Sequence, residues 1–100
     1  MTNFCLSDEK NIDFLKESFN LLSEPNRIKI LCLLWKNESL CVCEIIASLW
    51  IKQNLVSHHL SMFKRIWLFE QKKVWTNIYY SINKEVYEKL KILVWNIFNF

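Results

Sequence analysis

The sequence has no glycine in 100 residues and only one proline, although globular proteins average about 7% glycine. Its longest uninterrupted apolar run, residues 30–35, falls well short of the ~18 residues that suggest a membrane span. Its acidic start also lacks the basic segment of a signal peptide. At 52% hydrophobic and 23% charged residues, the composition is that of a folded chain. We therefore expect one cytoplasmic domain over residues 1–100, with no membrane partner and with a core small enough to favour partnering.

Four cysteines are present, and two of them, Cys41 and Cys43, are separated by one residue. In a cytoplasmic chain we expect reduced thiols, available for metal or redox chemistry, and not a disulfide framework. On a regular helix, residues two apart point about 200° away from each other. Both thiolates can therefore bind one ion only if the start of the helix is distorted. The alternative is that both cysteines are small buried hydrophobes.

Charge is unevenly distributed along the chain. Residues 1–26 carry two lysines against five acidic residues, a net −3, whereas residues 52–76 carry five basic residues against one acidic residue, a net +4. Positive charge concentrated in one segment is what phosphate binding requires. A solvated basic surface is the alternative explanation.

Helical periodicity dominates the first two thirds of the chain, and a β-prone pair of segments follows it. The expected elements are a first helix capped by Ser7, a second beginning at Pro25, helices over 41–49 and 53–66, strands over 68–71 and 78–82 around a polar loop at 72–77, and a last helix capped by Asn83 and ending near Phe98. This order, α-α-α-α-β-β-α, predicts a mainly α fold with a small β-hairpin. It is a winged helix-turn-helix whose core spans about residues 21–82.

The helix over 53–66 separates into two faces on a helical wheel. Val56, Leu60 and Phe63 share one side, and polar or basic side chains share the other. We expect the polar side to read DNA bases and the lysines and arginine to hold the phosphates, although an ordinary exposed face is the alternative. His59 lies toward the apolar side and is expected to make a structural hydrogen bond. The predicted DNA-binding residues are Lys52, Gln53, Asn54, Ser57, His58, Ser61, Lys64, Arg65, Lys72 and Lys73.

Three segments together resemble the ArsR/SmtB family of bacterial metal-sensing winged-helix repressors. They are LCVCEI at 40–45, SHHLSMFKR at 57–65 and IYYSI at 78–82. The resemblance implies a homodimer, built from the first and last helices, that binds double-stranded operator DNA when unliganded. It also implies that a soft metal or metalloid ion of the cadmium, lead or arsenite type releases the operator by binding Cys41 and Cys43.

The resemblance leaves the ligand set incomplete. Arsenite-type members are similar but carry a third cysteine three positions after the second, where this chain has Ile46. Cadmium- and lead-responsive members borrow thiolates from an N-terminal arm of the partner, which makes Cys5 a candidate third ligand. Cys32 is expected to pack in its helix. The family's zinc site on the last helix is not expected, because Glu85 and Glu88 have no histidine beside them.

Three other functions remain open. A disulfide or persulfide at Cys41 and Cys43 would make the protein a thiol-redox or sulfide-responsive repressor of the same fold. A winged helix used only for protein contact would lack salt-dependent binding to duplex DNA. A hydrolase built on Cys41 with His58 or His59 would have no third orienting group and no oxyanion donors.

Four of the five tryptophans stand where glycine is expected. Trp35 is predicted just after the second helix, Trp50 in the helix-turn-helix turn, Trp67 after the fourth helix and Trp75 in the hairpin, with Trp95 in the last helix. Helix ends and tight turns often need a left-handed backbone, which glycine adopts freely. Our hypothesis is that the gene comes from a bacterial lineage that reads UGA as glycine and is translated here with UGA as tryptophan. The alternative is that genuine tryptophans fill these turns.

Overall fold

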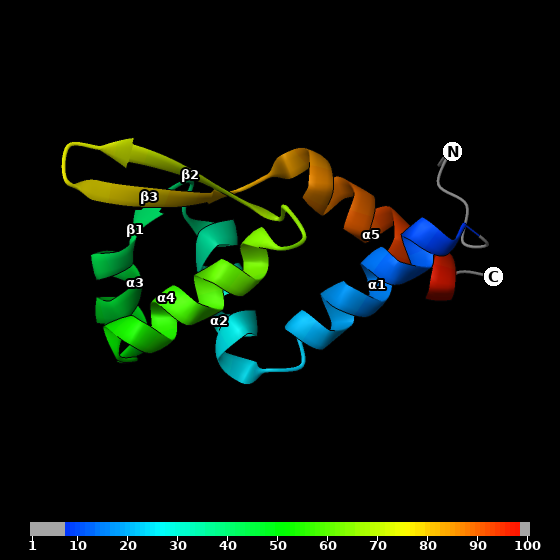
Figure 1. The fold of residues 1–100 in the computed structure, drawn as a ribbon, viewed down its shortest axis with the longest axis horizontal. Coiled ribbons are helices and arrows are strands. Elements are labelled where there is room, and N and C mark those ends of the chain that lie inside the picture. The colour runs from blue at the N-terminus through cyan, green and yellow to red at the C-terminus, as the bar shows by residue number, and fades with distance from the viewer. Residues whose placement is uncertain (1–7, 99–100) are drawn as a thin grey trace.

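The structure, a computed structural model, describes residues 8–98, which form five helices and one three-stranded antiparallel sheet (Figure 1). The sheet order is β1-β3-β2. This architecture confirms the predicted winged helix-turn-helix fold, mainly α with a β-hairpin. The elements are α1 (Glu9–Leu21), α2 (Pro25–Lys36), β1 (Leu40–Cys41), α3 (Val42–Leu49), α4 (Gln53–Lys64), β2 (Phe69–Val74), β3 (Asn77–Ile82) and α5 (Lys84–Phe98).

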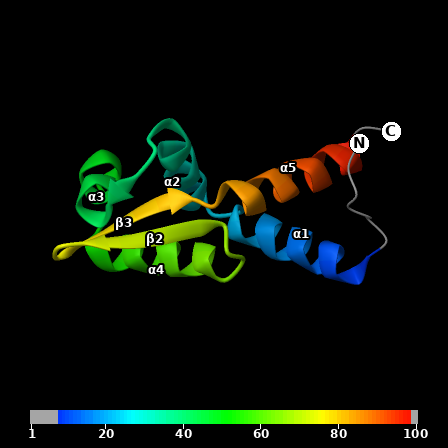
Figure 2. The ribbon, with the colours of Figure 1, turned by 90° about the horizontal axis from the view of Figure 1, so that it is seen from above.

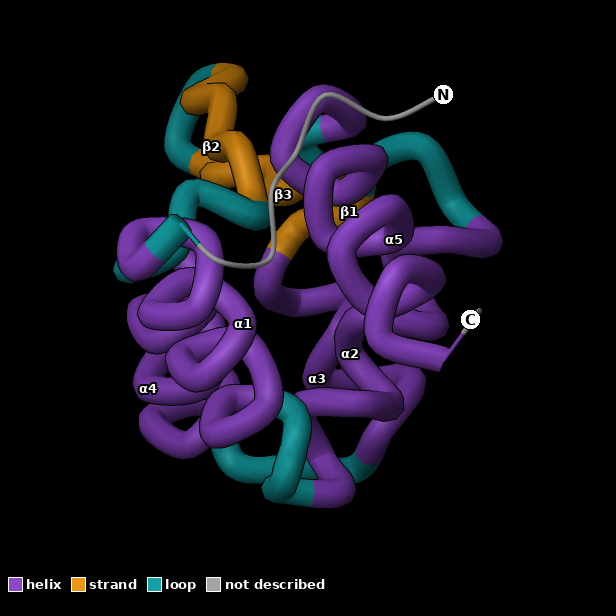
Figure 3. The backbone as a smooth tube through the Cα atoms, turned by 90° about the vertical axis from the view of Figure 1, so that its right-hand side faces the viewer, coloured by secondary structure: helices purple, strands orange, loops and turns teal. Residues whose placement is uncertain are grey.

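The elements are divided between two ends of an elongated molecule. Helices α1 and α5 lie side by side at one end, whereas α3, the start of α4 and the β2–β3 hairpin lie at the other (Figures 1 and 2). The strands gather on one side of the helices (Figure 3). The hairpin is therefore a wing beside α4. No helix among residues 8–98 combines the length and apolar character needed to cross a membrane.

The core lies where α2, α3, α4 and the sheet meet. Phe63 of α4 is fully buried, and its ring stacks on that of Phe69 in β2 with 4.0 Å between centroids. This contact anchors the base of the wing to α4. Truncating a buried phenylalanine to alanine typically costs about 3–5 kcal/mol. The other fully buried apolar side chains are Ile30, Ile45, Val56, Leu60, Leu68 and Leu93.

Helix caps set the boundaries of the longer helices. Asp8 caps α1 by accepting a hydrogen bond from the Lys10 amide at 2.9 Å, so the expectation of Ser7, which lies outside the described residues, is wrong. Pro25 begins α2 as predicted. Asn83 also caps α5 as predicted, because its Oδ1 accepts from the amides of Glu85 and Val86. At Asp8 and Asn83, a side-chain oxygen satisfies an amide that has no partner within its helix.

The structure differs from the sequence-based expectation at five places. Strand β1 was not predicted, because two residues carry no periodic signal. Helix α4 ends at Lys64 instead of residue 66, and α3 begins at Val42 instead of residue 41. The wing strands are longer than expected and the turn between them is only two residues, so residues 72–74 belong to β2 and not to a loop. Trp35 lies inside α2 and not after it.

Candidate DNA-binding surface and thiol pair

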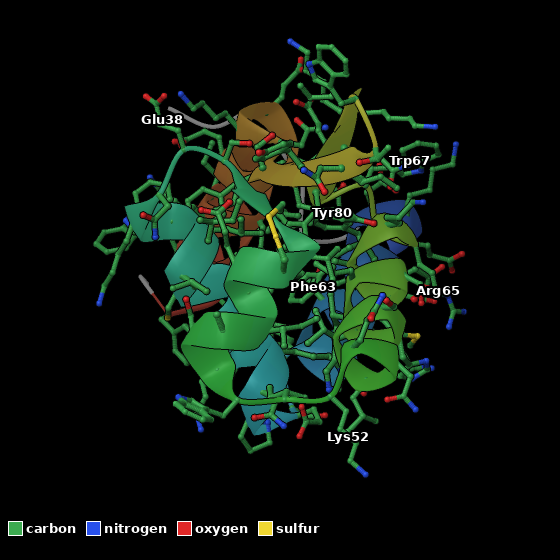
Figure 4. All side chains as sticks on the ribbon, turned by 90° about the vertical axis from the view of Figure 1, so that its left-hand side faces the viewer. Glu38, Lys52, Phe63, Arg65, Trp67 and Tyr80 are labelled. Carbon is green, nitrogen blue, oxygen red and sulfur yellow. A yellow bond between two sulfur atoms is a disulfide. The ribbon has the colours of Figure 1, made fainter. Side chains whose placement is uncertain are left out.

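Helix α4 has the two faces that its sequence predicts. Val56, Leu60 and Phe63 are fully buried, and Phe63 points into the molecule while Lys52 and Arg65 project outward (Figure 4). All the residues expected to bind DNA are exposed to solvent. They are Lys52, Gln53, Asn54, Ser57, His58, Ser61, Lys64, Arg65, Lys72 and Lys73.

Two side chains of this exposed face bond to their own helix. The Asn54 Oδ1 accepts from the Leu55 amide at 3.0 Å, and the Ser61 Oγ donates to the His58 carbonyl at 2.6 Å. The hydroxyl oxygen of Ser61 keeps lone pairs for a further bond, and the Asn54 amide keeps its NH₂ donors. Both side chains can therefore still reach a base edge.

The β2–β3 wing adds positive charge beside α4. Lys72 pairs with Tyr79 in the β2–β3 register, and Lys73 pairs with Ile78. Successive side chains of a strand point to opposite faces of the sheet. The two lysines therefore lie on opposite sides of the wing, where they can contact different phosphates but not the same one.

His59 links α4 to the start of α2. The Nε of Arg27 donates to the His59 Nδ1 at 3.1 Å, and the His59 Nε2 lies 3.7 Å from the Oε2 of Glu24. The same carboxylate caps α2 by accepting from the amides of Asn26 and Arg27. This confirms the expected structural hydrogen bond of His59. Its partners Arg27 and Glu24 lie 32 and 35 positions away in the sequence, so no local sequence pattern predicts them.

The environment of His59 favours the neutral imidazole. Its side chain is buried, and this desolvation lowers the pKa from the ordinary 6.5, with the positive charge of Arg27 acting in the same direction and the carboxylate of Glu24 opposing both. The Arg27 bond agrees with this direction, because Nδ1 must keep its lone pair to accept it. Desolvation and the Arg27 bond therefore outweigh the attraction of Glu24 at 3.7 Å.

The expectation of reduced thiols is wrong for Cys41 and Cys43, because their sulfur atoms form a disulfide at the start of α3 (Figure 4). Cys41 is extended, with φ −81° and ψ 163°, and belongs to β1, whereas Cys43 is already helical. This break between strand and helix brings together two side chains that a continuous helix would separate. It is the distorted helix start that the spacing requires. Cys41 is buried and Cys43 is exposed.

The backbone around Cys41 and Cys43 connects this pair to the wing and to α4. The Cys41 amide donates to the Oε1 of Glu44 at 3.0 Å, as in a capping box for α3. Cys41 also pairs with Tyr79 of the wing strand β3, and α3 packs against α4. Movement at the sulfur atoms therefore has a route to the wing and to α4.

Soft ions match the two sulfur donors in chemistry, but the described residues do not complete a ligand set. Thiolates select soft ions, yet no group of three or more His, Cys, Asp or Glu side chains suited to a metal occurs among residues 8–98. The expected third ligand, Cys5, lies outside the described residues. Cys32 is exposed on α2 with a free thiol, so the expectation that it packs in the helix is wrong.

Comparison with known proteins identifies relatives for most of the chain. A profile of the family described as bacterial regulatory protein, arsR family, matches residues 24–65. The chain is 38% identical to the uncharacterized HTH-type transcriptional regulator MJ1325 of Methanocaldococcus jannaschii, over 77% of this chain and 88% of that protein. It is 34% identical to the cadmium resistance transcriptional regulatory protein CadC of Listeria innocua, over 64% of this chain. It spans only 54% of the length of that CadC.

Solved structures show the same fold. HlyU from Vibrio cholerae superimposes with a TM-score of 0.73 and 28% identity, covering 86% of this chain and 94% of HlyU. The reduced form of the same HlyU gives a TM-score of 0.71 and 26% identity, covering 92% of this chain and 96% of HlyU. The winged helix-turn-helix architecture of residues 8–98 is thus shared with known regulators.

Proposed function

Because this chain belongs to the ArsR family of bacterial regulatory proteins, which are transcriptional regulators and not enzymes, we propose that it represses a gene by binding operator DNA and that Cys41 and Cys43 control this binding. The observation that carries the proposal is the two-faced helix α4. One face is fully buried in the core, and the other presents polar and basic side chains to solvent beside a basic wing.

Helix α4 is the element that would enter the major groove. Asn54, Ser57, His58 and Ser61 supply hydrogen-bonding groups of the kind that read base edges, and the start of such a helix is the part closest to the bases. The side chain of Gln53 stands at this start. The cations beside this face would hold phosphates and so set affinity and salt dependence. They are Lys52, Lys64, Arg65, Lys72 and Lys73.

A homodimer would place two such helices on successive turns of the duplex. Helices α1 and α5, which lie together at the end opposite the wing, are the proposed interface (Figure 1). Helix α5 lines an apolar groove with Leu90, Val94 and Trp95, and α2 contributes Leu31. A cytoplasmic location follows from this proposal, because the operator is there.

The proposed inducer is a soft ion of the cadmium, lead or arsenite type. Two adjacent sulfur atoms are suited to such an ion, and the CadC relative is a cadmium resistance regulator. Cys5 is the proposed third ligand. The ion binds thiolates, so a cellular thiol reductant must first supply two electrons and two protons to cleave the Cys41–Cys43 disulfide. Binding to the two deprotonated sulfur atoms would then set a new spacing between Cys41 and Cys43, and the change would pass through β1 to the wing and through α3 to α4.

A redox switch is the second candidate, favoured by the sulfur–sulfur bond itself. Two thiols lose two electrons and two protons to a peroxide or disulfide oxidant and form the Cys41–Cys43 bond. A reductant reverses the step. The position of Cys43, exposed beside the buried Cys41, gives an oxidant access to one sulfur.

The decisive experiment measures the affinity of the purified protein for duplex DNA from its own promoter by fluorescence anisotropy. It is run with reduced protein, with oxidised protein and with reduced protein plus cadmium, lead or arsenite, each across a series of salt concentrations. We expect tight, salt-dependent binding by one thiol state and weaker binding by another. If no thiol state binds duplex DNA at low ionic strength, the regulator proposal fails in favour of a protein-contact module.

A further inference from the structure

Three residues of this chain have a left-handed backbone, and all three are tryptophan. The φ angles are 57° at Trp50, 60° at Trp67 and 59° at Trp75, and no other residue from 8 to 98 has a positive φ. The whole chain contains no glycine. Every described position that needs the conformation typical of glycine is thus held by the same unrelated residue type.

A left-handed backbone is costly for any residue with a Cβ atom. The Cβ approaches the following carbonyl oxygen, which disfavours the conformation by about 5- to 30-fold at each residue. Asn and Asp reduce this cost through local hydrogen bonds of their side chains, and an indole cannot do so in the same way. Tryptophan is therefore among the least expected residues at these three sites.

Two of the sites lie at the C-terminal ends of helices, Trp50 as the C-cap of α3 and Trp67 in the turn that follows α4. Trp50 ends α3, and its amide donates to the Ile46 carbonyl at 2.9 Å. After α4, the Leu68 amide returns to the Phe63 carbonyl at 3.3 Å across Trp67. This bond spans six residues, as in the motif that ends helices with a left-handed glycine. The hydrogen bonds hold both backbones in a conformation that suits glycine.

The third site is the first central residue of the wing turn. Val74 pairs with Asn77, which leaves Trp75 and Thr76 as the two-residue loop. Only the first of these has a positive φ. That pattern belongs to the type II′ hairpin turn, which takes glycine at its first central position.

The side chains at these sites give no reason for tryptophan. Trp50, Trp67 and Trp75 are 93%, 74% and 90% exposed, so their indoles add little to the core. Burial of the apolar ring is the usual gain from a tryptophan. Here that gain is absent while the backbone cost is present.

We infer that the protein made in its own cell carries glycine at positions 50, 67 and 75. That cell reads the codon UGA as glycine, whereas the sequence printed here was translated with UGA as tryptophan. Trp35 and Trp95 are different, since both lie inside helices, where the backbone does not require glycine. Their identity follows from the codon alone. Positions 50 and 75 border the lysines of the proposed DNA-binding surface, so glycine there would present bare backbone in place of two indoles.

The first test reads the coding DNA and the protein from the source cells. We expect TGA codons at positions 50, 67 and 75, and we expect peptide masses that contain glycine there. TGG codons at these three positions, or peptide masses that contain tryptophan, would overturn the inference.

The second test compares glycine with alanine at each site by denaturant unfolding. Both changes remove the exposed indole, but only glycine removes the Cβ. At positions 50, 67 and 75 we expect the glycine variant to have an unfolding equilibrium constant about 5- to 30-fold smaller than the alanine variant. Equal stability of the two variants at all three sites would contradict the backbone argument.

Positions 35 and 95 provide the matched control. Inside a helix, glycine is the poorer residue, so Trp35→Gly and Trp95→Gly should unfold about fivefold more readily than Trp35→Ala and Trp95→Ala. If the chain with tryptophan does not fold when produced, the same comparison is made with the two triple variants at positions 50, 67 and 75. We then expect the triple glycine variant to yield folded protein and the triple alanine variant not to. Neither test depends on DNA binding, so both can be interpreted even if the regulator proposal fails.

Discussion

The backbone of Cys41 pairs with that of Tyr79 in the β1–β3 ladder, so the thiol pair and the wing share one sheet. Cys41 is also the residue directly before α3, which packs against α4. A change in sulfur chemistry at this one residue would therefore reach both the wing and α4, the two elements of the proposed DNA-binding surface.

Removing either thiol should uncouple DNA binding from the inducer. We expect Cys41→Ser and Cys43→Ser each to keep duplex binding and to lose its response to cadmium, lead, arsenite or oxidant. Anisotropy titrations with and without each agent provide the measurement. Cys32→Ser is the matched control, because that thiol is free and exposed on α2, and a lost response in this variant would place the sensor elsewhere.

Thiol counting separates the two inducer chemistries. An oxidative switch consumes two titratable thiols per chain and is reversed by a reductant, whereas ion binding is reversed by a chelator. We expect one of these behaviours to accompany operator release in the unaltered chain. Release that neither a reductant nor a chelator reverses would contradict both forms of the thiol proposal.

The basic wing should contribute salt-dependent and sequence-independent affinity. We expect Lys72→Ala to weaken binding to all duplexes alike and to reduce the slope of log K against log salt by about 0.9. Lys91→Ala is the control, because Lys91 lies on α5 and pairs with Glu88 at 3.3 Å. An unchanged slope for the wing variant would show that Lys72 contacts no phosphate.

Helix α4 should instead contribute sequence selectivity. Ser57→Ala and Asn54→Ala remove groups that can bond base edges, so each should lower operator affinity by about 1–3 kcal/mol and affect unrelated duplexes much less. Competition between operator and scrambled DNA measures the difference. Equal losses on both DNAs would assign these two side chains to the phosphate backbone.

The sequence predicted those features that depend on neighbouring residues. The faces of α4 follow from a period of 3.6 residues, and the start of α2 at Pro25 and the cap of α5 at Asn83 follow from local side-chain chemistry. Features that depend on distant partners were missed. Strand β1 exists only because Tyr79 and Tyr80 lie beside it, and the Arg27–His59 bond joins residues 32 positions apart.

The thiol site shows the same division. The spacing of Cys41 and Cys43 correctly implied that a regular helix could not bring the sulfur atoms together. The spacing could not predict that the helix begins only after Cys41, because the extended conformation of Cys41 depends on its pairing with β3. Likewise, the absence of glycine pointed to the tryptophans as a group, but only the backbone angles separate positions 50, 67 and 75 from the two helical ones.

The cap of α3 should matter for stability. Glu44→Ala removes the acceptor for the Cys41 amide, and the loss of such a cap costs about 0.5–2 kcal/mol of the free energy of unfolding. Glu44→Gln keeps an acceptor oxygen and should lose less. Urea unfolding of the three proteins measures this order, and identical midpoints would mean that the bond contributes nothing in solution.

Stability should also fall on mild acidification because of His59. Its pKa in the folded protein is lowered from 6.5 by desolvation, so the unfolded chain binds more protons between the two values. The contribution of the neutral imidazole is therefore complete above about pH 6.5 and decreases as the pH falls below it toward the folded pKa. Protonation at Nδ1 also removes the acceptor for Arg27, while Glu24 limits the loss by favouring the cation.

The His59→Gln variant tests this pH dependence, because glutamine is neutral throughout and retains polar atoms that can face Arg27 and Glu24. We expect the free energy of unfolding of the unaltered chain to decrease between pH 7 and pH 5 more steeply than that of the variant. His58→Gln is the matched control, since the neighbouring imidazole is exposed and should leave most of the slope in place. Parallel slopes for the unaltered chain and His59→Gln would mean that other groups, and not the buried histidine between α2 and α4, govern the acid sensitivity.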